Sequence, residues 1–296
     1  MSPVSRRRKG AKPSQSGQRV LRTVQPAAPE EPCDCPNCSG AELDLEDLAN
    51  TLVGGAGELL KVDDPLDAEF FAAGFLAIGA MAGETFDEAL QEGILPAVAR
   101  HESSEALAVL IALDAVGAGP VAGDAAARLE RAGLALPSWA GELRGPVRLG
   151  QSLRFADSDG DASMLVCTFE RAGRGHGFVV HADHTDCDAA AEIALFPTEV
   201  LDEVLEEIRS DARHAGLTVT SEVLDPAELR WQIERALDAR EVHDLEDGDP
   251  EPPSDILDEE NDEDVPDYHL LAVLLRARIR TLPEPTRPPA PHGSTE

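Results

Sequence analysis

The sequence predicts an α+β protein whose mostly helical N-terminal half is followed by a small antiparallel β-meander with packed helices. Up to about residue 136, apolar residues recur at the three- and four-residue spacing of amphipathic helices. Beyond Pro137 they recur at every second position, interrupted by short Asp- and Gly-rich segments typical of tight turns between strands. Short connections favour antiparallel neighbours, so we expect the N-terminal half to be a helix bundle or a stack of helical hairpins.

The composition indicates a folded core built mainly from aliphatic side chains. Hydrophobic residues make up 42% of the 296 residues, whereas aromatic residues make up only 4%. The formal net charge of -32 argues against binding to nucleic acid or to an anionic membrane, because both contacts need positive charge. No apolar run reaches the roughly 18–20 residues of a membrane helix, and the basic N-terminus lacks the apolar stretch of a secretory signal. We therefore expect a cytoplasmic protein without nucleic-acid or membrane partners.

Charge and proline content divide the chain into folded and disordered stretches. Three segments have too little apolar surface to offset the entropy of ordering them, so we expect them to be disordered. They are a basic, Pro-rich tail with a cysteine cluster (1–40), an acidic linker (244–265) and a Pro-rich tail (283–296). The folded stretches are a helical region (41–136), an α+β region with the antiparallel sheet (137–243) and a docking helix (266–282).

Capping residues and prolines mark the expected helix boundaries in the helical region. Asp64 is a predicted N-cap, with Pro65 at the first helical position. The stretch from Phe70 to Met81 is apolar on nearly every side, which predicts a helix in the middle of the bundle. Pro96 predicts a kink. Further helices are expected to start near Ala41 and to cover 84–100, 103–117 and 120–133.

The α+β region is expected to begin with three strands and to continue with helices and a fourth strand. The strands run from Val147 to Phe155, from Met164 to Phe169 and from Phe178 to Ala182. The following elements are a helix over 185–195, a helix from Pro197 to Gly216, a strand over 217–223 and a helix capped by Asp225.

The first turn of this meander, Asp157 to Asp161, resembles the start of a calcium loop. The glycine and glutamate positions of an EF-hand are not matched, and strands rather than helices flank the segment. A hairpin turn built on Asp-Gly is therefore the favoured interpretation.

The docking helix carries five apolar residues at helical spacing and three arginines near its end. A lone helix of this length would be marginal in water, so we expect it to pack on the folded body. The arginines lie where the helix dipole favours cations. The apolar residues are Leu270, Leu271, Leu274, Leu275 and Ile279, and the arginines are Arg276, Arg278 and Arg280.

An odd number of cysteines, five, argues against a disulfide framework. Cys33, Cys35 and Cys38 include one C-x-x-C spacing, which is half of a zinc site. The fourth zinc ligand could be Cys187, a histidine or a cysteine of a second copy of the chain. The competing interpretation is that this segment is a disordered tail with free thiols. Cys167 is expected in the core. Cys187 is expected at a helix start as an unreactive thiol, because aspartates flank it.

A second candidate site is the segment that contains His181, Asp183 and His184. Strand alternation places His181 and Asp183 on one face, and His184 follows at the strand end. Two imidazoles and a carboxylate could hold a transition metal or act as a general base with its orienting acid. The favoured alternative is a plain turn, in which Asp183 bonds local backbone and Asp186 caps the next helix.

The functional expectation follows from missing catalytic motifs and long charged flanks. The sequence contains no Gly-x-Ser-x-Gly, no His-Glu-x-x-His and no P-loop. We therefore predict a non-catalytic binding or regulatory protein, with the N-terminal cysteines as a candidate zinc site. The acidic run is interpreted first as a solvated linker, and a second interpretation is that it binds a basic protein partner. The alternative is a metal-dependent hydrolase that uses His181, Asp183 and His184.

Overall fold

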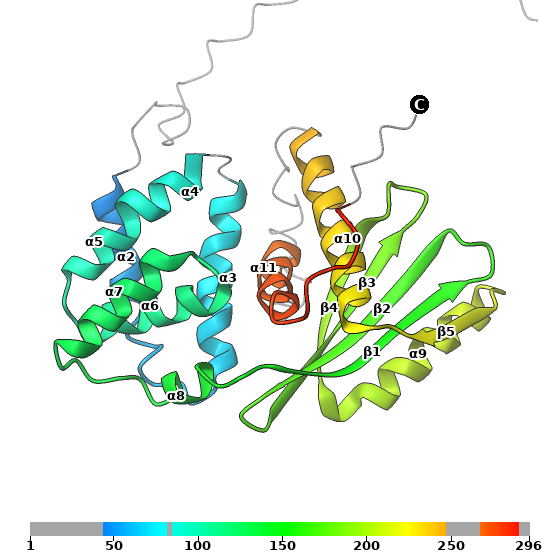
Figure 1. The fold of residues 1–296 in the computed structure, drawn as a ribbon, viewed down its shortest axis with the longest axis horizontal. Helices are drawn as coiled ribbons and strands as arrows, with labels where there is room; N and C mark the ends of the chain where they lie inside the picture. Colours follow the sequence, from blue (N-terminus) through cyan, green and yellow to red (C-terminus); the bar gives the residue numbers. More distant parts are fainter. Residues whose placement is uncertain (1–43, 82–84, 247–266, 290–296) are drawn as a thin grey trace, which may run out of the picture. The chain divides into compact units, whose positions relative to one another are not determined.

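The computed structural model describes residues 44–81, 85–246 and 267–289, all of which belong to one compact unit, Asp44–Glu296. Helices come first along the chain and a five-stranded antiparallel sheet with packed helices follows (Figure 1). This order confirms the predicted α+β class. The predicted disordered tail 1–40 lies outside the described residues, as do most of the acidic linker and the last residues of the chain.

Asp64 is an N-cap in the helical half that the sequence predicts, and Asp44 is one that it does not predict. Asp44 accepts the N–H groups of Glu46 and Asp47, and Asp64 accepts that of Leu66. The helices are α2 (Leu45–Gly55), α3 (Pro65–Met81), α4 (Thr85–Ala89), the π-helical turn η1 (Leu90–Ile94), α5 (Leu95–Arg100), α6 (Ser104–Val116), α7 (Pro120–Arg131) and α8 (Ala140–Leu143).

A π-helical turn precedes Pro96, the position at which the sequence predicts a kink. The chain widens into the π-helical turn η1 just before this proline. A proline ring inside a helix crowds the carbonyl four residues earlier, here that of Glu92, and a wider turn relieves the contact.

The sheet has the strand order β4-β3-β2-β1-β5, and every neighbouring pair is antiparallel. Its strands are β1 (Arg148–Asp157), β2 (Ala162–Arg171), β3 (Arg174–Asp183), β4 (Ala189–Pro197) and β5 (Val219–Val223). The helix predicted over 185–195 is therefore wrong, because a turn and then the edge strand β4 occupy this segment. Its alanines and acids favour a helix locally, but pairing with β3 overrides that preference.

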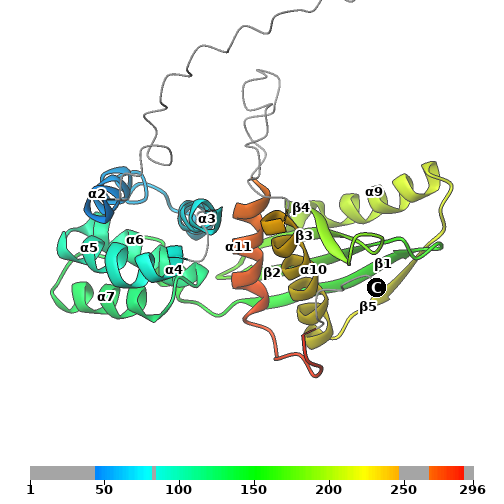
Figure 2. The same ribbon diagram turned by 90° about the horizontal axis from the view of Figure 1, so that it is seen from above.

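Helices cover both faces of the sheet (Figure 2). On one face, Phe155, Val166 and Phe196 pack against α9 (Leu201–His214). The other face packs against α10 (Pro226–Glu246) and α11 (Tyr268–Ile279). Residues on that second face include Leu165, Cys167, Phe169, Phe178 and Val180.

Helix α11 joins the helical half to the sheet, since it contacts both α3 and β4 and lies between α3 and α10 in Figure 1. Leu271, Leu274 and Leu275 are at most 1% exposed, which confirms that this helix docks on the body. Arg278 lies in the last turn of α11, as predicted. Its side chain is buried and pairs with the buried Glu69 of α3.

Residues 283–289, which the sequence assigns to the tail 283–296, contact α10. Trp231 Nε1 of α10 donates a hydrogen bond of 2.9 Å to the carbonyl of Pro288. The guanidinium of Arg287 lies 3.4 Å from the centre of the Trp231 ring. Proline limits the freedom of this segment before it docks, so fewer contacts are needed to hold it on α10.

The turn between β1 and β2 is a hairpin turn closed by Asp157, as the sequence favours. The Asp157 carboxylate accepts the N–H groups of Gly160, Asp161 and Ala162. Gly160 has a φ of 80°, which a glycine adopts without strain. Replacing Asp157 with alanine should lower the free energy of unfolding by about 1 kcal/mol, as for the loss of a helix cap.

Urea unfolding of the variant measures this change. Asp159→Ala is the control, because the hydrogen bond that Asp159 accepts from the described residues is a long one, 3.4 Å from Ser158 in the same turn. Equal effects of the two substitutions would contradict the assigned role of Asp157.

Candidate functional site

The turn between β3 and β4, His184 to Asp188, packs against α10. Polar side chains lie on both sides of this turn and face the helix. Cys187 and Asp188 have φ values of 57° and 65°, an unusual pair of consecutive left-handed residues without glycine. Each such residue costs on the order of 1 kcal/mol. The contacts of the turn with α10 must offset this cost: Asp188 pairs with Arg235, and Asp186 lies 3.4 Å from Nδ1 of His243.

On one side of this turn lies a pocket of about 520 Å³. Its floor is the sheet face that carries Arg154, and the turn contributes His184 and Asp188. Helix α10 forms another wall through Trp231 and Arg235, and the C-terminal segment adds Arg287. The volume falls in the range of small-molecule sites, which are about 300–1,000 Å³.

The turn and α10 form a chain of three charged or polar groups at this pocket. The carboxylate of Asp188 pairs with the guanidinium of Arg235 and lies 2.5 Å from Nδ1 of His184. A carboxylate beside Nδ1 places a proton on that nitrogen, and in the neutral imidazole Nε2 of His184 then presents its lone pair. Nε2 is buried and has no hydrogen-bond partner among the described residues.

Arg154 supplies a second unpaired atom to the same pocket. Its Nε is buried and lacks a hydrogen-bond partner within the described part of the chain. Its Nη1 reaches Glu222 at 3.4 Å, and that carboxylate is 60% exposed, so the pair is weak. Buried polar groups are nearly always paired with protein, water or ligand. Arg154 and His184 both line the pocket, so a small movement of either side chain would present its unpaired atom to an occupant.

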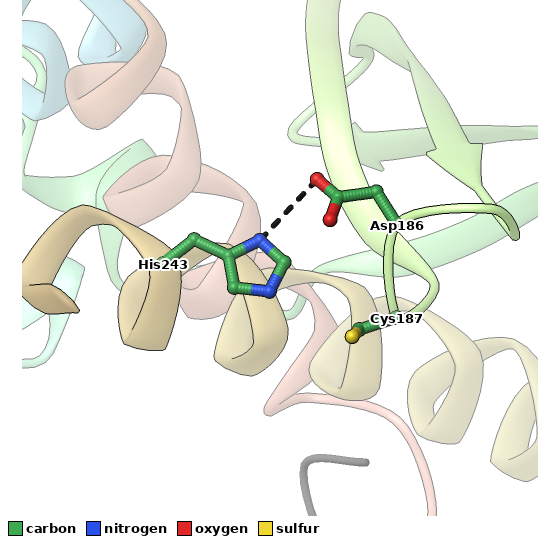
Figure 3. Close-up of side chains that lie close together, drawn as sticks. All are labelled: Asp186, Cys187 and His243. Atoms are coloured by element: carbon green, nitrogen blue, oxygen red, sulfur yellow. Dashed lines mark ion pairs between the residues drawn. The ribbon is translucent and has the colours of Figure 1, made fainter. Parts of the chain in front are cut away.

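The other side of the turn carries Asp186 and Cys187 opposite His243 of α10 (Figure 3). One possible ligand atom from each residue lies within 4.8 Å of the other two, and Nδ1 of His243 is 3.4 Å from Oδ2 of Asp186. Among the described residues this is the one group of three such side chains that meets the distance. A thiol, an imidazole and a carboxylate form a donor set suited to a transition metal.

The structure separates the trio that the sequence suggested. His181 and Asp183 share the α9 side of β3, as strand alternation requires, whereas His184 lines the pocket on the α10 side. Asp183 accepts hydrogen bonds from the hydroxyl and the N–H of Thr185, which hold the pKa of its carboxyl below the usual value. The expectation that Asp183 bonds local backbone is thereby confirmed.

The cysteines fall into three groups. Cys33, Cys35 and Cys38 lie outside the described residues. Cys167 is in the core as predicted, and burial raises the pKa of its thiol to about 12, so it stays protonated and unreactive. The prediction for Cys187 is wrong in its position, because the residue lies in a turn before a strand and no helix starts there for Asp186 to cap.

Sequence reasoning missed the partners that α10 brings to the turn. Arg235 lies 47 residues from Asp188, and His243 lies 57 residues from Asp186 along the chain. The sequence did contain one signal of a site at this turn, the segment Asp186-Cys-Asp188. Three such side chains in a row seldom serve packing alone.

Comparisons with protein-family models, curated proteins and solved structures found no match to this chain. In the part of the chain that the structure describes, no helix combines the length and apolar character needed to cross a membrane. The site must therefore be interpreted from its own chemistry.

Proposed function

We propose that the protein is a non-catalytic binding protein whose ligand is a small anion that also carries a hydroxyl or amino group. The ligand occupies the pocket between the sheet, α10 and the β3–β4 turn. One observation carries the proposal: Nε of Arg154 and Nε2 of His184 are both buried without a hydrogen-bond partner among the described residues, and both residues line this pocket. The arginine recognises the anionic group, and the imidazole accepts a hydrogen bond from the hydroxyl or amine.

The charge around the pocket supports an anionic ligand. Arg154, Arg235 and Arg287 line it together, in a chain whose formal net charge is -32. Asp188 and Glu228 also line it and pair with Arg235 and Arg287, so these two arginines are largely neutralised. The positive charge of Arg154 remains the least compensated, which makes this residue the expected anchor of the ligand.

Binding of inorganic phosphate, malate, citrate and a hexose phosphate to the full chain, measured by calorimetry, tests the proposal. Arg154→Met should weaken binding about 10- to 100-fold, the value of a hydrogen bond to a charged group. His184→Phe should weaken it by a smaller factor. Arg209→Met is the matched control, because Arg209 lies over Phe155 on the opposite face of the sheet. Binding by none of these anions, or binding unaffected by both pocket substitutions, would contradict the proposal.

Hydrolysis is the second candidate, and one observation favours it. An imidazole oriented by a carboxylate, as in His184 and Asp188, is the usual form of a general base. Ser163 lines the same pocket, but no hydrogen bond joins its hydroxyl to His184 within the described residues. Release of nitrophenol from its acetate and phosphate esters, with and without added zinc, tests this candidate. Turnover that disappears in His184→Gln would favour hydrolysis over binding.

A further inference from the structure

We propose that Asp186, Cys187 and His243 form a zinc site that fixes the β3–β4 turn to α10. The three side chains converge on one space from two elements, as Figure 3 shows. The site is separate from the pocket, although the turn between His184 and Asp188 contributes to both. It also differs from the N-terminal cysteine cluster that the sequence suggested.

The spacing of the three side chains suits a tetrahedral ion. Zinc bonds of 2.0–2.3 Å place neighbouring ligand atoms about 3.3–3.8 Å apart. Nδ1 of His243 and Oδ2 of Asp186 are 3.4 Å apart, which is long for a hydrogen bond but fits one edge of such a tetrahedron. The three ligand atoms all lie within 4.8 Å of one another, so small rotations of the side chains bring them onto one ion.

The donor types favour zinc over the common hard cations. Calcium and magnesium take oxygen ligands, whereas a thiolate with an imidazole selects zinc or a similar transition metal. Three protein ligands leave the fourth position for water or another donor, a pattern of open zinc sites. The side chain of Asp186 is 63% exposed and that of His243 is 18% exposed, so an ion can enter from solvent.

The left-handed backbone conformations in the turn indicate that the metal has a structural role. Cys187 and Asp188 are both held in the left-handed region, at a cost that local contacts must offset. A metal bound by Asp186 and Cys187 would lock the turn to α10. It would thereby also hold Asp188, which pairs with Arg235 and His184 at the pocket.

Metal content of the untagged full chain, purified without chelator, is the first measurement. We expect close to one equivalent of zinc, and Cys187→Ser or His243→Ala should each weaken binding at least tenfold. His214→Ala is the matched control, because His214 is an exposed histidine at the end of α9. Serine replacement of Cys33, Cys35 and Cys38 together should leave the metal in place.

Cobalt added to metal-free protein gives a second, spectroscopic measurement. A tetrahedral site with a thiolate ligand should produce strong visible bands and a sulfur-to-cobalt charge-transfer band, and Cys187→Ser should remove the latter. Circular dichroism checks that each variant is folded. The proposal is overturned if neither metal binds, or if binding is lost with the N-terminal cysteines and kept in Cys187→Ser and His243→Ala. Anion binding is measured separately through Arg154, so the two proposals can fail independently.

Discussion

Replacing Glu69 with alanine is expected to lower the free energy of unfolding by about 3–5 kcal/mol. Glu69 is 1% exposed and accepts hydrogen bonds from both Nη atoms of Arg278, one of them at 2.7 Å, and from Nη1 of Arg171 at 2.7 Å. Burial alone would raise the pKa of Glu69, but hydrogen bonds and charge from the two arginines outweigh it, so the pKa is lowered. Without this carboxylate, Arg278 would be a buried cation without a counter-charge.

Urea unfolding of matched variants separates the contribution of the Glu69 charge to stability from that of side-chain packing. Glu130→Ala removes an exposed partner of Arg144 and should have little effect, because exposed pairs contribute little. The double variant Glu69→Met with Arg278→Met removes both charges and keeps side-chain volume, so it should cost less than Glu69→Ala. A loss in Glu69→Ala no larger than in Glu130→Ala would contradict the assigned role of this pair.

The same pair shows what the sequence could and could not predict about α11. The leucine spacing predicted correctly that this helix docks. Arg278 lies seven positions after Leu271 and three after Leu275, so helical spacing already placed it on the buried stripe. The sequence did not identify its partner, because Glu69 is 209 residues away and only the tertiary contact between α3 and α11 joins them.

The position of the candidate site depends on residues 185–195, for which the local sequence favours the wrong secondary structure. Residues 185–195 contain alanines and acids that favour a helix, yet β4 is an edge strand that pairs only with β3. A helix starting at Thr185 would have directed Asp186 and Cys187 differently. The strand instead leaves a five-residue turn, which faces α10 and thereby reaches Arg235 and His243.

Stability is expected to fall as the pH is lowered from 6.5 toward about 4, because His176 must stay neutral in the folded protein. Its Nε2 accepts a hydrogen bond of 2.9 Å from Nε of Arg278, and the rings of Phe169 and Phe178 lie against it. Burial, followed by the charge of Arg278, lowers the pKa of His176 from 6.5 to about 4.

The sign of the effect follows from proton uptake in the two states. Between these two pKa values the unfolded chain binds a proton at His176 and the folded chain does not, so lower pH favours unfolding. The contribution is fully present above pH 6.5 and is lost as the pH falls to about 4. It amounts to on the order of 3 kcal/mol, since one pKa unit corresponds to about 1.4 kcal/mol.

Urea unfolding at several pH values between about 7 and 4.5 measures this dependence. Carboxylates also titrate in this range, so the informative quantity is the difference between the wild type and His176→Gln. Glutamine keeps an acceptor for Arg278 but takes up no proton, and the slope of stability against pH should become shallower. His101→Gln is the control, because His101 is exposed and its replacement should leave the slope unchanged. A slope that His176→Gln does not alter would show that His176 binds a proton equally well in both states. The hydrogen bond from Arg278 to a neutral imidazole would then be absent in solution.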